Sequence, residues 1–279
     1  MNKRILISAD FEGVSGIVGP RQCIPSSGDA FQTARGLWMG EINAAVEGAL
    51  DGGADEVVVN EAHAQMNYLD PERLHPRASF ISGYVKTDNQ VEGLQNGAAG
   101  VIYMGHARAG TRDGNLAHTY MLRELIEIRL NGEPIGEFGL NALWAAYHRT
   151  PVLLAVGDDK LAKEAQVLLP DIETVVVKTG LSQFSAHCLP VGQAREMIRA
   201  AAKSAVEKCA QRKALKIPSF LVMEIDFTLP EAARLCAFVP GVERIGGRTV
   251  LFRSNDYRQL QQLRVVCTNL ALAVTNAHF

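Results

Sequence analysis

Short apolar runs, rich in Val and Ile, alternate along the chain with longer segments in which apolar residues return every three or four positions. The first pattern is typical of buried strands, and the second of helices that cover a sheet. We predict strands at 5–9, 56–60, 78–82, 100–105, 151–156 and 173–177, and helices at 30–51, 89–96, 137–147, 160–169 and 191–212. This alternation predicts an α/β fold with a mostly parallel sheet flanked by helices.

The pattern changes after Ile217-Pro218. There we expect strands at 220–225 and 249–252, helices at 230–237 and 256–276, and a hairpin turn at Gly246-Gly247. A further strand at 122–130 precedes the strong turn signal Asn131-Gly132, and a Gly/Ser/Gln-rich loop follows residue 177. We therefore predict two parts: residues 1–217 as the α/β domain that carries the chemistry, and residues 218–279 as a smaller α+β portion.

Composition narrows the class of partner. The chain has 279 residues, a net charge of −2 and a sequence pI near 6.4. A protein without a basic surface is a poor ligand for nucleic acid or for an anionic membrane, so we expect neither. The five cysteines are scattered and no apolar run approaches transmembrane length, which together favour reduced thiols and a cytoplasmic location.

Two carboxylates, Asp10 and Glu12, directly follow the first predicted strand. Side chains at positions i and i+2 of an extended chain point to the same face, so both carboxylates can contact the same bound ion or group. Like charges held this close repel each other, and a shared proton or a bound cation relieves the repulsion. The alternative interpretation is that Asp10 only caps a turn.

Two other predicted strands end close to a histidine, at His63 and His106. Ligands in parallel α/β sheets collect outside the carboxyl ends of the strands, where Asp10 and Glu12 also lie. A single histidine after a strand is usually a hydrogen-bonded turn residue, but two of them beside a carboxylate pair favour a metal site. Glu137 opens a predicted helix, where a carboxylate can simply interact with the helix dipole.

Several short motifs occur in order along nearly the whole chain: Ser8-Ala-Asp-Phe-Glu-Gly-Val-Ser-Gly16, Asn60-Glu-Ala-His63, Leu74-His-Pro76, Met104-Gly-His-Ala-Arg108, Ala117-His118, Gly136-Glu-Phe-Gly-Leu-Asn-Ala142 and Gly157-Asp-Asp159. In these motifs the chain resembles the M55 zinc peptidases, a family typified by the bacterial D-aminopeptidase of the dipeptide transport operon. Phe11 and Glu61-Ala62 depart conservatively from the family pattern. They leave every expected ligand in place, and bear on substrate preference more than on chemistry.

The resemblance implies a site with two Zn²⁺ per subunit, in which Asp10, Glu12, His63, His106 and Glu137 are the ligands and His118 has a catalytic role. It also implies a homodecameric ring with active sites facing an inner channel. The expected function is a zinc-dependent aminopeptidase that releases the N-terminal residue of short peptides, including peptides that begin with a D-amino acid. A metal-activated water would attack, with His118 as general acid/base; a nucleophilic role for His118 stays open.

Two alternatives belong to other functional classes. Asp10-x-Glu12 after a first strand also resembles the start of two-metal exonucleases and related phosphodiesterases, but the later carboxylate motif and a basic groove are missing. A non-enzymatic metal-binding protein would need protein groups to saturate the site, whereas five ligands shared by two ions leave positions open. The polar loop from Ala107 to Ala117, which leads into His118, is long enough to be functional.

Overall fold

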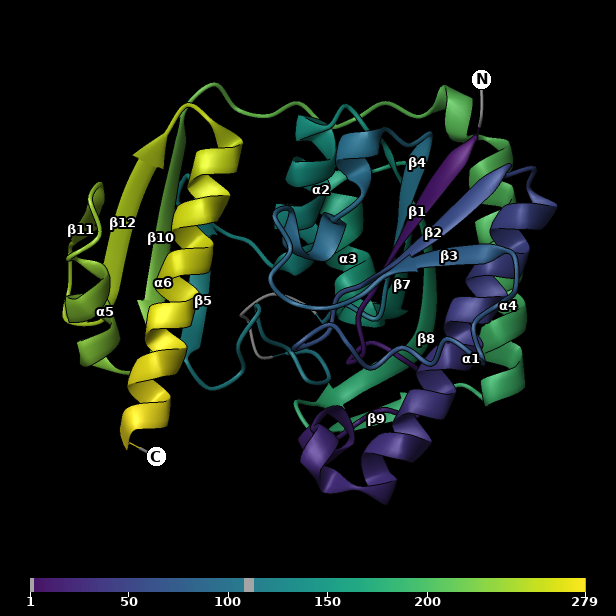
Figure 1. Ribbon diagram of the computed structural model, residues 1–279, viewed down its shortest axis with the longest axis horizontal. Helices are drawn as coiled ribbons and strands as arrows, with labels where there is room; N and C mark the ends of the chain where they lie inside the picture. Colours follow the sequence, from purple (N-terminus) through teal and green to yellow (C-terminus); the bar gives the residue numbers. More distant parts are fainter. Residues whose placement is uncertain (1–2, 108–112, 279) are drawn as a thin grey trace.

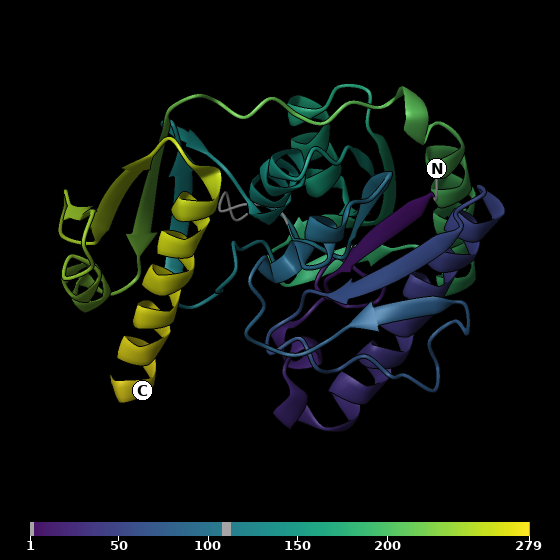
Figure 2. The same cartoon turned by 45° about the horizontal axis from the view of Figure 1, so that its top comes forward.

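Two β-sheets lie side by side in the molecule (Figure 1). The chain is seen here as a computed structural model, which describes residues 3–107 and 113–278. The larger sheet has seven strands in the order β3-β2-β1-β4-β7-β8-β9, and the smaller has five in the order β11-β12-β10-β5-β6. The two sheets remain separate when the molecule is turned (Figure 2).

The larger sheet carries the candidate chemistry. Its strands are β1 (Arg4–Ala9), β2 (Glu56–Glu61), β3 (Ala78–Ile81), β4 (Gly100–Met104), β7 (Val152–Asp158), β8 (Glu173–Ser182) and β9 (Ser185–Cys188). All neighbouring pairs are parallel except β8 and β9. The prediction of a mostly parallel sheet with flanking helices is confirmed.

Helices cover both faces of the larger sheet. Helices α1 (Asp29–Asp51) and α4 (Val191–Glu207) lie on one face, and α2 (Glu137–Tyr147) and α3 (Asp159–Leu168) on the other. Because strand side chains alternate, Ile5 and Ile7 join the core beneath α1 and α4, whereas Leu6 joins the opposite core. Glycine at position 48 lets α4 approach α1 closely, since a Cβ there would lie 2.2 Å from the carbonyl oxygen of Arg199.

The smaller sheet draws its strands from two distant parts of the sequence. It combines β5 (Leu125–Leu130) and β6 (Glu133–Pro134) with β10 (Leu221–Phe227), β11 (Val242–Arg244) and β12 (Thr249–Ser254). Antiparallel pairing of β5 with β10 therefore crosses the predicted boundary at residues 217 and 218. The division into two domains stays a prediction, but the sheet itself includes residues from both parts.

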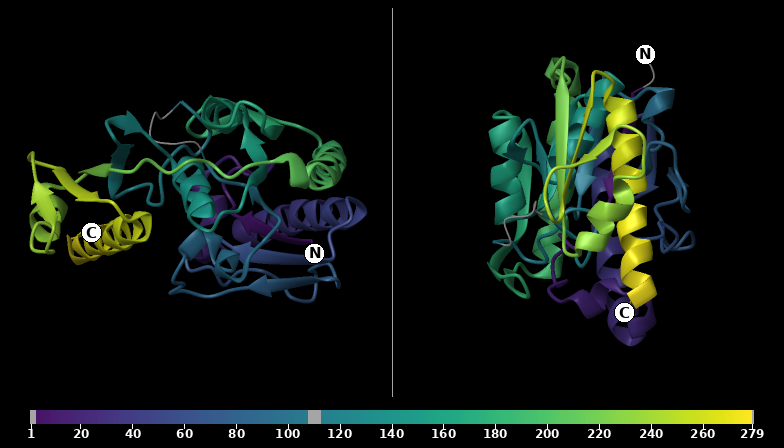
Figure 3. Two further views of the ribbon diagram at one scale, coloured as in Figure 1. Left: turned by 90° about the horizontal axis from the view of Figure 1, so that it is seen from above. Right: turned by 90° about the vertical axis from the view of Figure 1, so that its left-hand side faces the viewer.

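Helices α5 (Pro230–Cys236) and α6 (Tyr257–His278) complete this part of the molecule. Seen from above, a connection between α4 and β10 without helix or strand after residue 211 passes from the larger part to the smaller (Figure 3). One hydrophobic core continues from α2 into the smaller sheet, and in it Trp144 of α2 meets the ring of Tyr257 of α6 edge-on. The two sheets are thus joined by packing as well as by the chain.

Two local predictions were wrong. Residues 89–96 form two separate 3₁₀ helices, η3 (Asn89–Val91) and η4 (Leu94–Asn96), rather than one α-helix, because Gly93 between them has a φ of 104°. The loop expected after residue 177 is instead the end of β8, which pairs with β9 in a hairpin. Other 3₁₀ helices are η1 (Pro20–Cys23), η2 (Pro25–Ser27) and η5 (Cys209–Gln211). Among the helices described, none combines the length and apolarity that crossing a membrane requires.

Candidate metal centre

Three adjacent strands of the larger sheet end at the same edge. In the register of the sheet, Ala9 of β1 lies opposite both Glu61 of β2 and Met104 of β4. The residues that follow these strands therefore emerge together, which brings Asp10 close to His63 and His106. Helix α2 adds Glu137, its first residue, from the neighbouring layer.

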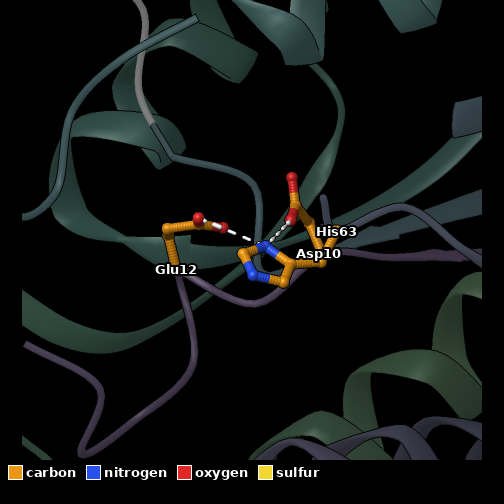
Figure 4. A group of neighbouring side chains, drawn as sticks. All are labelled: Asp10, Glu12 and His63. Atoms are coloured by element: carbon orange, nitrogen blue, oxygen red, sulfur yellow. Dashed lines mark ion pairs between the residues drawn. The ribbon is translucent and has the colours of Figure 1, made fainter. Parts of the chain in front are cut away.

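Asp10, Glu12 and His63 form the first of two ligand groups, called here the outer group. The Nδ1 atom of His63 lies 3.4 Å from Oδ1 of Asp10 and 3.2 Å from Oε1 of Glu12. Figure 4 shows this imidazole nitrogen facing both carboxylates. The potential ligand atoms of the three side chains lie within 4.8 Å of one another, a spacing that a single metal ion can fill.

Asp10, His106 and Glu137 form the second group, called here the inner group. The Nδ1 atom of His106 is 3.2 Å from Oδ2 of Asp10 and 3.2 Å from Oε2 of Glu137. The two oxygens of Asp10 thus face different groups. A carboxylate in that position can bridge two metal ions, which lie roughly 3.5–4 Å apart in two-metal sites.

Both imidazoles are oriented by contacts on the nitrogen that faces away from the carboxylates. His63 places Nε2 2.8 Å from the carbonyl oxygen of Cys23, to which an Nε2–H donates. His106 places Nε2 3.2 Å from the hydroxyl oxygen of Ser8, whose own proton goes to the carbonyl oxygen of Gln90. This arrangement leaves Nδ1 of each histidine available, as expected for a metal ligand fixed by its second ring nitrogen.

The inner group is supported by neutral side chains. The Nε2 atom of Gln90 donates to Oε2 of Glu137 at 2.7 Å and to Oδ2 of Asp10 at 3.4 Å. The Oε1 atom of Gln90 accepts from Nδ2 of Asn141 at 2.6 Å, which fixes the orientation of the amide. These residues are buried, so an unmet donor or acceptor here would be costly.

The outer group is supported by titratable side chains beneath the loop that follows Glu12. The buried Nζ of Lys178 donates to the carbonyl oxygens of Glu12 and Ile17, both at 2.5 Å. Glu41 of α1 accepts from the backbone N–H of Ser15 at 3.0 Å. The position of the outer group therefore depends on groups that titrate.

Gly105 and Gly13 allow the ends of β1 and β4 to approach closely. The backbone N–H of Asp10 donates to the carbonyl oxygen of Met104 at 2.8 Å. A Cβ on Gly105, whose φ is 72°, would lie 2.1 Å from the carbonyl oxygen of Asp10. Glycine is required at position 105 on both counts, since other residues disfavour this φ and the space is filled.

Burial and neighbouring charges shift the pKa values of the ligand side chains, raising some and lowering others. Burial, together with the charges of Glu12 and Glu137, raises the pKa of Asp10 to about 6. Burial would lower the pKa of His106, but hydrogen bonds to Asp10 and Glu137 raise it to about 9. For Glu12, burial opposes ionisation, yet the neighbouring His63 holds its pKa far below the usual range. Without metal, protons therefore stabilise the crowded carboxylates, and a divalent cation would displace them.

His118 approaches the inner group from the loop before β5. Its Nε2 lies 3.7 Å from Oε1 of Glu137, while Nδ1 is 2.7 Å from the carbonyl oxygen of Leu116. Nδ1–H donates to that carbonyl, so Nε2 is the nitrogen directed at the centre. The neighbouring N–H of Tyr120 donates to the same Glu137 oxygen at 2.6 Å, which attaches the loop to α2.

A cavity of about 660 Å³ opens beside the centre, within the usual range for small-molecule sites. Its wall includes Asp10, Glu12, His63, Glu137 and His118 at one end. Loops after β2 and before β5, together with α6, form much of the remaining wall, and η1 and η3 also contribute to it. Reactive groups gathered in one part of a cavity of this size suit a small substrate that must be oriented.

The residues fit a metal cofactor. The two groups offer two imidazole nitrogens and three carboxylates, which is a donor set that zinc accepts. The Oε2 atom of Glu12 is buried and has no hydrogen-bond partner within residues 3–107 and 113–278. A buried carboxylate oxygen without a partner is costly unless it binds a cation.

The structure brings together all five predicted ligands, and it places His118 beside Glu137. Part of the predicted functional loop, residues 108–112, lies outside the described residues. Sequence reasoning missed Gln90, which contacts a member of both groups. Its segment was predicted only as a helix, and a single glutamine carries no local pattern that signals such a role.

Comparisons with known proteins agree with this geometry. The profile of the family Peptidase_M55, described as D-aminopeptidase, matches residues 3–265. A D-aminopeptidase from Bacillus subtilis (strain 168) is 35% identical over 272 residues, which cover 96% of this chain and 98% of the relative. The solved structure of the Zn-dependent D-aminopeptidase DppA from Bacillus subtilis, described as a self-compartmentalizing protease, superposes with a TM-score of 0.91 at 34% identity, covering 96% of this chain and 98% of that one.

Proposed function

Because the chain belongs to the M55 family of D-aminopeptidases, we propose that it is a zinc-dependent aminopeptidase that releases the N-terminal residue of short peptides. The observation that carries the proposal is the pair of ligand groups sharing Asp10 in the wall of one cavity. The phosphodiesterase alternative is not favoured, since the relatives are peptidases and the chain has a net charge of −2.

Five residues would hold the metal: Asp10, Glu12, His63, His106 and Glu137. The outer group would hold one zinc ion and the inner group a second, and Asp10 belongs to both groups. Zinc supplies Lewis acidity, which activates water and polarises the scissile carbonyl at neutral pH. The number of ions is supported by the distances within each group and by the separate orientation of His63 and His106.

The chain's own residues would bind the substrate and move the proton. His118 holds its Nδ1 proton on Leu116, so its Nε2 can take a proton from the attacking water and return it to the leaving amine. A nucleophilic attack by the same nitrogen is the alternative that kinetics must test. Holding the substrate's free amino group at a carboxylate or metal of the centre would restrict cleavage to the N-terminal residue.

We also propose a preference for an N-terminal D-residue. The support is the family itself and the relative described as a Zn-dependent D-aminopeptidase, which is similar over 96% of this chain. The conservative departures at Phe11 and Glu61-Ala62 lie next to proposed ligands. Ala62 lines the cavity and Phe11 stacks on the ring of His63, so these departures bear on substrate preference more than on the chemistry.

The proposed assembly is a homodecameric ring. One similar structure is described as a self-compartmentalizing protease, and a ring that hides its sites would keep folded proteins away from an open metal centre. Light scattering tests this directly: a decamer has about ten times the mass of the 30.3 kDa chain. A stable monomer that trims long unfolded chains at full rate would contradict the proposal.

The decisive test of function compares matched D- and L-aminoacyl p-nitroanilides with metal-replete protein. We expect release of nitroaniline from the D series, its loss with EDTA, and its recovery when zinc is added back. N-acetylated versions of the same anilides serve as controls and should resist cleavage, because they lack the free amino group. Equal cleavage of acetylated and free substrates would rule out an aminopeptidase.

A further inference from the structure

Helix α6 forms the wall of the cavity away from the ligand groups, and it contributes Arg264 to that wall. The Arg264 side chain is 2% exposed, whereas Arg123, also in the cavity wall, is exposed. Arginine is seldom this buried unless its charge is paired. Within the described residues, however, Arg264 forms no ion pair with a carboxylate.

The guanidinium group is held in one orientation. The Nε atom of Arg264 donates to Oε1 of Gln261 at 3.0 Å, and Nε2 of Gln261 donates to the hydroxyl of Tyr257 at 2.6 Å. The Tyr257 hydroxyl in turn donates to the carbonyl oxygen of Leu140 in α2 at 2.5 Å. This buried chain of hydrogen bonds connects Arg264 to the helix that carries Glu137, so the guanidinium position is fixed relative to the metal centre.

Two buried donors remain free beside each other. The Nη2 atom of Arg264 and the hydroxyl of Tyr120 have no hydrogen-bond partner among residues 3–107 and 113–278. The guanidinium carbon lies 3.8 Å from the centre of the Tyr120 ring. Buried donors without partners are costly, and an anion that accepts from both would satisfy them together.

We propose that Arg264 and Tyr120 bind the C-terminal carboxylate of a short peptide whose amino end lies at the metal centre. A planar carboxylate suits the guanidinium fork and can also accept from a phenolic hydroxyl. The inference rests on the proposed aminopeptidase function, which fixes the direction of the peptide in the cavity. Arg264 and Tyr120 would recognise the C-terminal end of the substrate, which the five proposed metal ligands do not contact.

The arrangement also limits the length of the substrate. The backbone N–H of Tyr120 binds Glu137, and its ring contacts Arg264, so one tyrosine separates the ligand group from the guanidinium. Each extended residue of a peptide spans roughly 3.5 Å, so peptides of about two or three residues match this separation. Selection for short peptides would then arise within a single subunit, independently of any ring.

The test compares D-alanylglycine with D-alanylglycinamide, which differ only in the terminal carboxylate. Wild-type protein should prefer the acid, and Arg264→Met should lower the ratio of kcat/KM for acid over amide by about ten- to hundredfold, as expected for lost hydrogen bonds to a charged group. Tyr120→Phe keeps the ring and should lower the ratio less, by about threefold to tenfold. Arg123→Met, which removes an exposed arginine from the same cavity, should keep the wild-type ratio.

A binding measurement separates this inference from the proposed function. Calorimetry on metal-free protein, where hydrolysis is prevented, should show tighter binding of the acid than of the amide in wild type and equal binding in Arg264→Met. If that preference is found but no peptide is cleaved, the carboxylate site stands and the aminopeptidase function fails. If peptides are cleaved but folded Arg264→Met and Tyr120→Phe both keep the wild-type preference, the carboxylate site is wrong. A loss that is equal for acid and amide would likewise overturn it and indicate a purely structural role.

Discussion

The outer and inner ligand groups share Asp10 but are supported in different ways. In the inner group, His106 is 0% exposed and Glu137 is 1% exposed, and the neutral amide of Gln90 contacts Glu137 and Asp10. In the outer group, Glu12 lies at the cavity wall, and the loop behind it is held by the titratable side chains of Lys178 and Glu41. One half of the centre is thus fixed by neutral hydrogen bonds, and the other by groups that respond to pH.

The difference shows that one part of a crowded site can keep its hydrogen bonds at every pH while the other part responds to pH. Neutral amides keep their donor and acceptor pattern at every pH, so they suit a ligand group that must not change. Buried charges hold a loop firmly only while their protonation states persist. The comparison predicts that substitutions in the two groups will have different effects. They should differ in how well added imidazole rescues activity, in which metal-binding step is weakened, and in how stability depends on pH.

The largest effect is expected when one imidazole is removed from each group. His63→Ala and His106→Ala should each retain close to one divalent ion per chain instead of two, and activity should fall about 10³-fold or more, since each ion contributes several kcal/mol. Elemental analysis measures the metal content. Added imidazole should restore more activity to His63→Ala, because His63 lies at the cavity wall and His106 is enclosed.

His187→Ala is the matched control, since His187 is exposed on β9 and belongs to neither ligand group. It should keep metal and activity. Full metal content in both ligand variants would show that the assignment of the groups is wrong, and equal rescue by imidazole would remove the distinction between them.

The next effect separates catalysis from metal binding. His118→Ala should reduce kcat by ~10²–10⁴-fold, the usual contribution of general acid–base catalysis, while both metals remain bound. Its Nε2 is 3.7 Å from Glu137, so the side chain can lie beside the inner group without being a required ligand. Single-turnover kinetics with metal-replete protein measure the loss, and a decrease below about tenfold would contradict a catalytic role.

A smaller effect should be confined to the inner group. Gln90→Leu removes the amide that contacts Glu137 and should weaken one of two metal-binding steps by about 10–100-fold, as for other residues that orient metal ligands. Chelator competition resolves the two steps. The control is Gln65→Leu, because Gln65 lines the cavity but accepts a hydrogen bond from Tyr68 instead. Equal weakening of both steps would show that the two groups are not supported separately.

The smallest effect on activity is expected from Glu41→Gln, which tests the charged support of the outer group. Burial raises the pKa of Glu41 from its ordinary value of 4.5 to about 7. The folded chain then binds a proton more tightly than the unfolded chain, so this contribution to stability is complete below pH 4.5 and is lost as the pH rises through about 7. The uncharged glutamine avoids that loss and should be more stable than wild type at pH 8, by at most ~3 kcal/mol.

Urea unfolding at pH 5 and pH 8 measures this difference. The gain of Glu41→Gln should be small at pH 5 and larger at pH 8. Glu47→Gln, on the same helix but partly exposed, should show no such dependence. If the two substitutions behave alike, the charge at Glu41 does not govern the stability of the loop.

Much of the centre followed from the sequence, because the chemistry lies at the ends of strands. Apolar runs located β1, β2 and β4, and the rule that parallel strands end at one edge then gathered Asp10, His63 and His106. Glu137 gave no such signal, since a glutamate in the first turn of a helix is common. The family resemblance, rather than periodicity, linked it to the site.

What could not be predicted depends on contacts between distant segments. The alternation at 122–130 indicated a strand, but nothing local showed that β5 would pair with β10. The sequence predicts the helix that carries Arg264. The proposed binding role of Arg264 follows only from its position above the Tyr120 ring, which the sequence does not show. Tertiary packing, which no short window of sequence contains, decides both features.

The pairing of β5 with β10 also affects how the protein is made. Arg129 of β5 binds Asp226 of β10 across 97 residues of sequence, which a ribosome adds in about 5–20 s. During that interval β5 has only the short β6 as a partner, and an unpaired strand edge can associate with other chains. The loop that carries His118 and Tyr120 leads directly into β5, so it stays unanchored on that side until β10 emerges, when about four-fifths of the chain has been made. A nascent chain therefore cannot complete its site before synthesis is nearly finished.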